Sequence, residues 1–111
     1  MTRKIILDCD PGHDDAVALL LALGNPNIDL LGITTVGGNQ ILDKVSHNAR
    51  VVKEIAGHPE VPVYAGCDRP LVRPVEVAEA IHGSTGMDVE GVELPEPSTA
   101  LADAHAIDFI I

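Results

Sequence analysis

A dense cluster of carboxylates lies near the start of the chain and indicates metal or acid–base chemistry. The four residues fall within eight positions, at Asp8, Asp10, Asp14 and Asp15. Because like charges this close repel one another, the cluster is most stable when a cation lies among its oxygens. Oxygen ligands favour Ca²⁺ or Mg²⁺ over Zn²⁺, and His13 has no second histidine or cysteine at zinc-ligand spacing. A turn and a helix start would explain single members, but the whole cluster predicts a site for a hard divalent cation.

The cluster lies between a predicted strand and a predicted helix. Residues 4–7 (KIIL) form a β-branched-rich apolar run, which is typical of a buried strand. Residues 16–23 are apolar nearly all round, so we expect a helix that is buried on more than one side and has Asp14 and Asp15 in its first turn. In open α/β sheets, ligands bind beyond the carboxyl ends of the strands. The cluster therefore occupies the position in which this architecture places a functional site.

The remaining pattern alternates strands and helices. The predicted elements are a strand at 28–36, a helix at 41–56, a short strand at 61–64, a glycine- and proline-rich loop at 65–97 and a last helix capped by Ser98 or Thr99. This order predicts the α/β class: a parallel, Rossmann-like sheet with flanking helices on both faces, joined by right-handed crossovers.

Composition limits the class of protein. The 111 residues suffice for one domain, and the formal net charge of −10 argues against nucleic acids and anionic membrane surfaces as partners. The longest apolar stretch, at 16–23, is far shorter than the roughly 20 residues that span a bilayer. Two cysteines are too few for a disulfide framework, so we expect a reduced, cytoplasmic chain. Residues 107–111 are mostly apolar, which is unusual at the end of a domain.

Residues 8–16 (DCDPGHDDA) closely resemble the D-x-D-x-G-x-D-D-A signature of the nucleoside hydrolases, which include inosine–uridine-preferring and pyrimidine-preferring enzymes. Further segments match the family in order, at residues 34–39 (TTVGGN), 48–49 (NA), 63–66 (VYAG) and 81–88 (IHGSTGMD). The resemblance implies hydrolysis of the N-glycosidic bond of a ribonucleoside to ribose and a free base, through an oxocarbenium-like transition state. It also implies Ca²⁺ as the cofactor. Purine and pyrimidine bases both remain open as leaving groups.

The resemblance also implies roles for individual residues. Asp10 matches the general base that takes a proton from the attacking water and also contacts the metal, and Asp15 matches a bidentate Ca²⁺ ligand. Asp14 matches the carboxylate that holds the ribose hydroxyls, and Asn39 matches an amide near the water and the sugar. Asp8 is expected to orient the loop or a ligand, or to serve as a turn carboxylate.

His82 is the next candidate. In pyrimidine-preferring relatives a histidine in this loop faces the nucleobase, so His82 is expected to bind the leaving base or to help protonate it. Cys9, in or beside the first strand, is expected to be a small core residue. The other histidines are expected to be structural or to face solvent; they are His13, His47, His58 and His105.

The length departs from the family. Nucleoside hydrolases are considerably longer, and their remaining metal and substrate ligands come from later strands. We therefore expect residues 1–111 to form the N-terminal segment of a single nucleoside hydrolase domain, which assembles into a dimer or tetramer when complete. Two alternatives stay open. In the first, the chain is a haloacid-dehalogenase-type Mg²⁺-dependent phosphatase, because residues 7–10 (LDCD) also resemble the start of that family, although Gly12 stands where the family has Thr or Val. In the second, the chain is an inactive α/β fragment.

Overall fold

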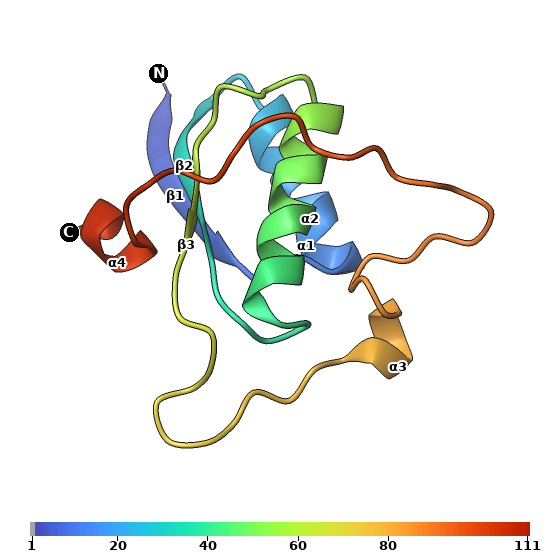
Figure 1. Cartoon of the computed structure of the whole chain (residues 1–111). Helices are drawn as coiled ribbons and strands as arrows, with labels where there is room; N and C mark the ends of the chain where they lie inside the picture. The colour runs from blue at the N-terminus through green and yellow to red at the C-terminus, as the bar shows by residue number, and fades with distance from the viewer. Residues whose placement is uncertain (1) are drawn as a thin grey trace.

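A three-stranded parallel sheet organises the computed structural model, which describes residues 2–111 (Figure 1). The strands β1 (Arg3–Cys9), β2 (Ile28–Thr35) and β3 (Val63–Ala65) lie side by side in chain order. The helix α1 (His13–Gly24) connects the first two strands, and α2 (Leu42–Ile55) connects the second and third. The predicted α/β class is therefore correct.

Both long helices pack on one face of this sheet (Figure 1). Strands that follow one another in chain order and share the usual crossover hand place their helices on the same side. The core between the layers is aliphatic and includes Leu19 and Leu23 of α1, Ile33 of β2, Val45 of α2 and Val63 of β3. This layer holds the carboxyl ends of the strands in a fixed relation to the helices that follow them.

The prediction that helices cover both faces is correct only in part. Within residues 2–111, the opposite face carries one short helix, α4 (Ala106–Ile110). Phe109 of α4 stacks on Tyr64 with ring centroids 4.0 Å apart, and Gly32 leaves room for its ring. Toward β1 this face stays open, and Ile6 is exposed there. The five-residue helix is too short to cover three strands.

The prediction that α1 is buried on more than one side is wrong for the described chain. Leu19 and Leu23 face the core, but Val17 is 65% exposed and Leu21 is 69% exposed. The apolar sequence therefore leaves a second, uncovered apolar face on this helix. None of the helices in residues 2–111 is long and apolar enough to cross a membrane.

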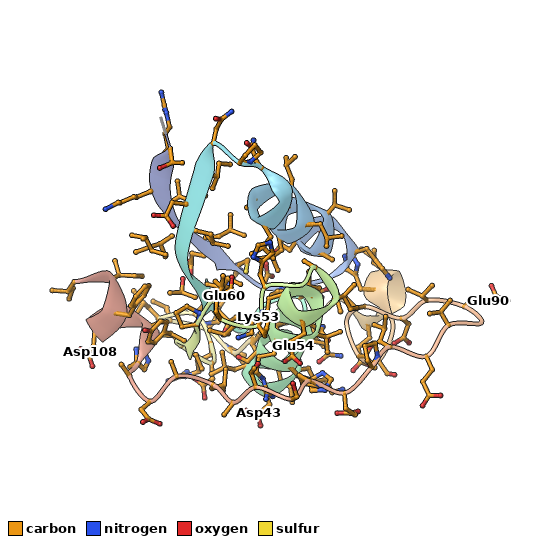
Figure 2. The ribbon with its side chains drawn as sticks, turned by 90° about the horizontal axis from the view of Figure 1, so that it is seen from above. Asp43, Lys53, Glu54, Glu60, Glu90 and Asp108 are labelled. Carbon is orange, nitrogen blue, oxygen red and sulfur yellow. The ribbon has the colours of Figure 1, made fainter. Side chains whose placement is uncertain are left out.

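The last helix begins later than predicted, and the residues expected to cap it bond to another helix. The hydroxyls of Ser98 and Thr99 donate to the carboxylate of Glu54 on α2 at 2.8 and 2.7 Å, and Figure 2 shows where Glu54 lies on that helix. The helix α4 starts at Ala106, where Nδ1 of His105 accepts the N–H of Ile107. The loop expected at 65–97 also contains a four-residue helix, α3 (Glu79–His82).

Candidate active site

The candidate site lies where β1 and β2 end side by side. Cys9 pairs with Thr35 at the last position of the ladder, so the residues that follow the two strands meet at one edge of the sheet. The backbone N–H of Asn39 donates to Oδ2 of Asp10 at 2.8 Å. This bond joins the acidic loop, which we define as residues 10–15, to the loop that follows β2.

Asp15 turns back toward Asp10 from the first turn of α1. The backbone N–H of Asp10 donates to Oδ2 of Asp15 at 2.9 Å. Desolvation raises the pKa of Asp15, and the carboxylates of Asp10 and Asp14 add to this effect, while the N–H of Asp10 opposes it. The carboxylates are thus held close together at an electrostatic cost that a bound cation would offset.

Gly38 allows the loop after β2 to close on Asp10. A Cβ on Gly38 would lie 2.5 Å from Oδ2 of Asp10, which is closer than real Cβ atoms approach. Any larger side chain at this position would therefore displace either the loop or the carboxylate. The absence of a side chain at Gly38 is what lets Asn39 reach Asp10 with its backbone N–H.

Asn39 is buried, with 9% of its surface exposed. Its Nδ2 donates to the carbonyls of Pro11 at 3.3 Å and Gly86 at 3.1 Å. Within the described part of the chain, its Oδ1 is buried and has no hydrogen-bond partner. A buried acceptor without a donor costs about 1–3 kcal/mol, so this oxygen is suited to accept a hydrogen bond from a ligand.

Asp14 and Asp8 lie differently from the central pair. Asp14 is exposed in the first turn of α1, beside Asp15. Asp8 belongs to β1, and its Oδ1 accepts the hydroxyl of Thr34 across the ladder at 2.6 Å. Asp8 therefore joins β1 to β2 two residues before the acidic loop begins. Asp14, in contrast, is accessible to a ligand from solvent.

His82 comes to the acidic loop from a distant part of the sequence. Its Nδ1 lies 2.9 Å from Nδ1 of His13, the first residue of α1. A Cβ on Gly12 would lie 3.0 Å from Nδ1 of His82 and 2.7 Å from Nδ2 of Asn39. The structure thus brings His82 beside Asn39, over the glycine at the centre of the acidic loop.

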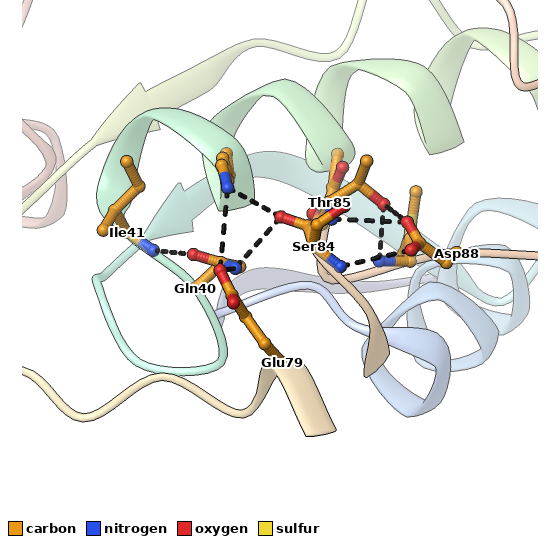
Figure 3. A network of polar contacts seen from close by, with 9 residues as sticks. Gln40, Ile41, Glu79, Ser84, Thr85 and Asp88 are labelled. Atoms are coloured by element: carbon orange, nitrogen blue, oxygen red, sulfur yellow. Dashed lines mark hydrogen bonds and ion pairs between the residues drawn. The ribbon is translucent and has the colours of Figure 1, made fainter. Parts of the chain in front are cut away.

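Three buried side-chain amides hold the loop that carries His82. We call Asn39, Gln40 and Asn48 the amide clamp. Nε2 of Gln40 donates to the carbonyl of Ser84 at 3.0 Å, Nδ2 of Asn48 to that of Thr85 at 2.9 Å, and Nδ2 of Asn39 to that of Gly86. Figure 3 shows the Gln40 part of this network, in which Nε2 of Gln40 also donates to Glu79. Each of three successive carbonyls therefore has its own amide donor.

Sequence reasoning did not identify Gln40, Asn48 or His13 as parts of this site. Asn48 falls on the apolar face predicted for the helix at 41–56, and a polar side chain on that face was the available signal. His13 lies inside the acidic signature but was expected to be structural or to face solvent. Gln40 carried no signal of its own, because its partners lie about 40 positions further along the chain.

Cys9 is a core residue, as the sequence predicts. Its side chain is buried, and Sγ donates to the carbonyl of Thr34 at 3.6 Å. Burial raises the pKa of the thiol, and the nearby carboxylates of Asp15, Asp8 and Asp10 raise it further. The thiolate is therefore disfavoured, which argues against a nucleophilic role.

The donor set fits a hard divalent cation in type but not in number. Asp10 and Asp15 each use one carboxylate oxygen to accept a backbone N–H. Among residues 2–111 no group of three or more His, Cys, Asp or Glu side chains is placed to hold a metal. Because Ca²⁺ takes roughly 6–8 oxygen ligands, this pair would supply part of a coordination shell that water, substrate or further protein groups complete.

Comparison with known proteins identifies the family. The model of the inosine-uridine preferring nucleoside hydrolases matches residues 5–111. The chain belongs to this family. It is 60% identical to the inosine-uridine preferring nucleoside hydrolase of Leishmania major, over 100% of this chain and 35% of the relative. It is 52% identical to the pyrimidine-specific ribonucleoside hydrolase RihB of Escherichia coli, over 98% of this chain and 34% of the relative.

Solved nucleoside hydrolases share the fold. The purine-preferring ribonucleoside hydrolase from Gardnerella vaginalis superposes with a TM-score of 0.88 at 38% identity, over 97% of this chain and 35% of that structure. The chain therefore spans about a third of the length of these nucleoside hydrolases and matches their N-terminal third. Family membership favours the nucleoside hydrolase interpretation over the phosphatase alternative. The family generally uses a metal ion, which agrees with the donor type at the acidic loop.

Proposed function

We propose that this chain supplies the water-activating and sugar-binding side of a ribonucleoside hydrolase active site. The observation that carries the proposal is the convergence of Asp10, Asp15 and Asn39 at the carboxyl ends of β1 and β2. Asp10 and Asp15 lie in the family signature and Asn39 lies in the next matching segment, and the partnerless Oδ1 of Asn39 offers an acceptor for a hydroxyl. The proposed reaction cleaves the N-glycosidic bond of a ribonucleoside with water, which yields ribose and a free base.

The residues of the site have distinct tasks in the proposed reaction. Asp10 acts as general base and removes a proton from the attacking water, an effect worth roughly 10²–10⁴-fold in rate. The exposed carboxylate of Asp14 and Oδ1 of Asn39 accept hydrogen bonds from ribose hydroxyls. The negative charge of the acidic loop stabilises the positive charge that develops on the sugar. His82 binds the base as it leaves.

We propose Ca²⁺ as the cation and Asp10 and Asp15 as its ligands in this chain. The support is the oxygen-only donor set and the raised pKa of Asp15, which burial raises most and the carboxylates of Asp10 and Asp14 raise further. When bound, such a cation orients water and sugar hydroxyls and lowers the pKa of the water. Calorimetry with Ca²⁺ and with Mg²⁺, after chelation with EDTA, tests this choice; tighter binding of Mg²⁺ would contradict it.

We further propose that residues 1–111 form the N-terminal segment of one larger domain. The uncovered apolar face of α1 and the open sheet face beside β1 support this arrangement, because such surfaces are normally packed. Assembly of the complete protein into a dimer or tetramer and a cytoplasmic location belong to the same proposal, on the resemblance alone. Size-exclusion chromatography with light scattering tests the assembly.

A chimera tests the proposed activity. Residues 1–111 replace the corresponding third of the Leishmania major relative, to which they are 60% identical. We expect the chimera to release base from uridine or inosine. A chimera that folds like its parent but releases no base, or that hydrolyses only phosphate esters, would overturn the proposal and leave an inactive fragment or a phosphatase.

A further inference from the structure

We propose that His13 is a positioning residue that holds His82 by Nδ1 and leaves Nε2 of His82 to face the ligand. This inference rests on the proposed function for its purpose, because the ligand group is then the base of a nucleoside. It also assigns to His13 a task that the sequence did not indicate. His13 makes three contacts, one through its main chain and two through its ring, and one ring nitrogen of His82 has no partner.

The first contacts join His13 to His82 directly. The two Nδ1 atoms lie 2.9 Å apart, and the backbone N–H of His13 lies 3.3 Å from the same Nδ1 of His82. The rings lie 5.0 Å apart between centroids and are tilted by 36°. These two contacts compete for Nδ1 of His82, because a ring nitrogen that donates to the imidazole of His13 cannot also accept the main-chain N–H of His13; the ring contact is the shorter of the two.

The third contact fixes the ring of His13. Its Nε2 lies 2.6 Å from the carbonyl oxygen of Asp88. A carbonyl only accepts, so Nε2 of His13 must carry the proton and donate. Asp88 is itself anchored: its N–H donates to the carbonyl of His82 at 3.0 Å, and its carboxylate accepts the N–H of Ser84 at 3.1 Å. A neutral His13 therefore accepts at Nδ1, so Nδ1–H of His82 donates to it and Nε2 of His82 is left as an unprotonated acceptor.

The remaining nitrogen is Nε2 of His82, which contacts no donor or acceptor in the described residues. Which nitrogen of an imidazole is available is set by the bond that the other nitrogen makes. His13 lies in the acidic loop, next to Asp14. Its contact therefore positions His82 relative to the sugar-binding carboxylates and not only relative to the loop that carries His82. A misplacement of about 1 Å in such a group can cost about 10²-fold in rate.

Three substitutions of His13 separate the two contacts of its side chain. His13→Ala removes both of these and keeps the main-chain N–H, which can then donate to Nδ1 of His82. His13→Asn places a polar atom near the position of Nδ1 and keeps the contact with His82, whereas His13→Gln reaches the position of Nε2 and keeps only the contact with Asp88. His58→Ala is the matched control, because His58 is a partly exposed histidine whose Nδ1 contacts Glu60 away from the site.

The first readout is the tautomer of His82, measured by imidazole ¹⁵N–¹H correlation spectra of the 111-residue chain. We expect the Nδ1–H tautomer of His82 in the native chain, in His13→Asn and in His58→Ala, and a shift toward the Nε2–H tautomer in His13→Ala and His13→Gln, where the main-chain N–H of His13 can donate to Nδ1. The Nε2–H tautomer already in the native chain, or an Nδ1–H tautomer that survives His13→Ala, would overturn the inference.

The second readout is base release by the chimera described above. We expect His13→Ala and His13→Gln to lower kcat roughly 10- to 100-fold with little change in KM, and His13→Asn to restore most of it. An active chimera that His13→Ala does not slow would overturn the inference and leave the proposed function intact. A locked tautomer in a chimera that releases no base would overturn the proposed function and leave the His13 contact standing.

Discussion

The acidic loop and the loop that carries His82 reach the same site but are held there by different means. The acidic loop is fixed by backbone donors at the strand ends, such as the N–H of Asn39 to Asp10. The loop at 79–88 is held by the amide clamp, whose side chains come from residues about 40 positions earlier. The first arrangement is local to the sheet edge, whereas the second joins segments that lie far apart in the sequence. We therefore expect the base side of the site to be the more easily disturbed.

The largest expected effect comes from removing the chemistry of the acidic loop without disturbing its fold. Asp10→Asn keeps an oxygen to accept the N–H of Asn39 but removes the base. We expect base release by the chimera to fall by roughly 10²–10⁴-fold at unchanged melting temperature. Asp43→Asn, which removes an equal charge from the exposed first turn of α2, is the control. Activity that survives in Asp10→Asn would show that Asp10 is not the general base.

The next effect comes from pushing the acidic loop and the loop after β2 apart. A Cβ in Gly38→Ala would lie 2.5 Å from Oδ2 of Asp10, so the carboxylate must move. We expect base release to fall by about 10²-fold and urea unfolding to show a loss of about 1–3 kcal/mol. Gly24→Ala is the control, since its Cβ would meet nothing within 4 Å. Equal losses of activity and stability in Gly38→Ala and Gly24→Ala would contradict the close approach of Gly38 to the carboxylate of Asp10.

A smaller effect is expected from removing single amide donors of the clamp. Gln40→Ala removes the donor to Glu79 and Ser84, and Asn48→Ala removes the donor shared by Pro11 and Thr85. We expect losses in unfolding free energy of about 1 and about 2 kcal/mol, respectively. Hydrogen exchange should quicken in both variants at 84–88, and at the acidic loop only in Asn48→Ala. Uniform protection across both loops in both variants would contradict a difference in anchoring.

The smallest effect is expected at residues 98–99, which bond to the side chain of Glu54 on α2. Hydrogen bonds from the N–H and hydroxyl of Ser98 and Thr99 lower the pKa of Glu54 to about 2 from its usual 4.5. Because the folded pKa is depressed, the contact stabilises the fold above about pH 4.5 and is lost as the pH falls toward 2. Carboxyl ¹³C titration of Glu54 checks this, with Glu93, an exposed glutamate, as the reference. A titration midpoint for Glu54 equal to that of Glu93 would contradict the contact between Glu54 and the Ser98–Thr99 segment.

The sequence allowed the acidic loop to be predicted because its information is local. The strand ends, the carboxylates of Asp10 and Asp15 and the amide of Asn39 all follow from short motifs at the ends of two adjacent strands. The partners of His82 could not be predicted in the same way. His13 and His82 are 69 positions apart, and no local pattern encodes their contact.

The errors in the fold have the same origin. Ser98 and Thr99 have the right chemistry for a helix cap, but no helix follows them directly. Instead, the hydroxyl of Ser98 and the N–H of Thr99 donate to the carboxylate of Glu54, which lies more than 40 positions earlier. The apolar pattern of α1 predicted more than one buried face, yet within residues 2–111 only one face is packed. In both cases the sequence specifies what a side chain can do, and tertiary contacts decide which partner it finds.

The claim that Asp10 and Asp15 face one common cation can be tested directly by amide NMR of the chain during a Ca²⁺ titration. The N–H groups of Asp10 and Asn39 donate to the two carboxylates and report on them, while those of Ser98 and Thr99 donate to Glu54 and serve as an internal control. We expect the first pair to shift together with one midpoint, on the order of millimolar or below, and the control pair to stay in place. Equal shifts in both pairs, or none at Asp10 and Asn39, would contradict the account.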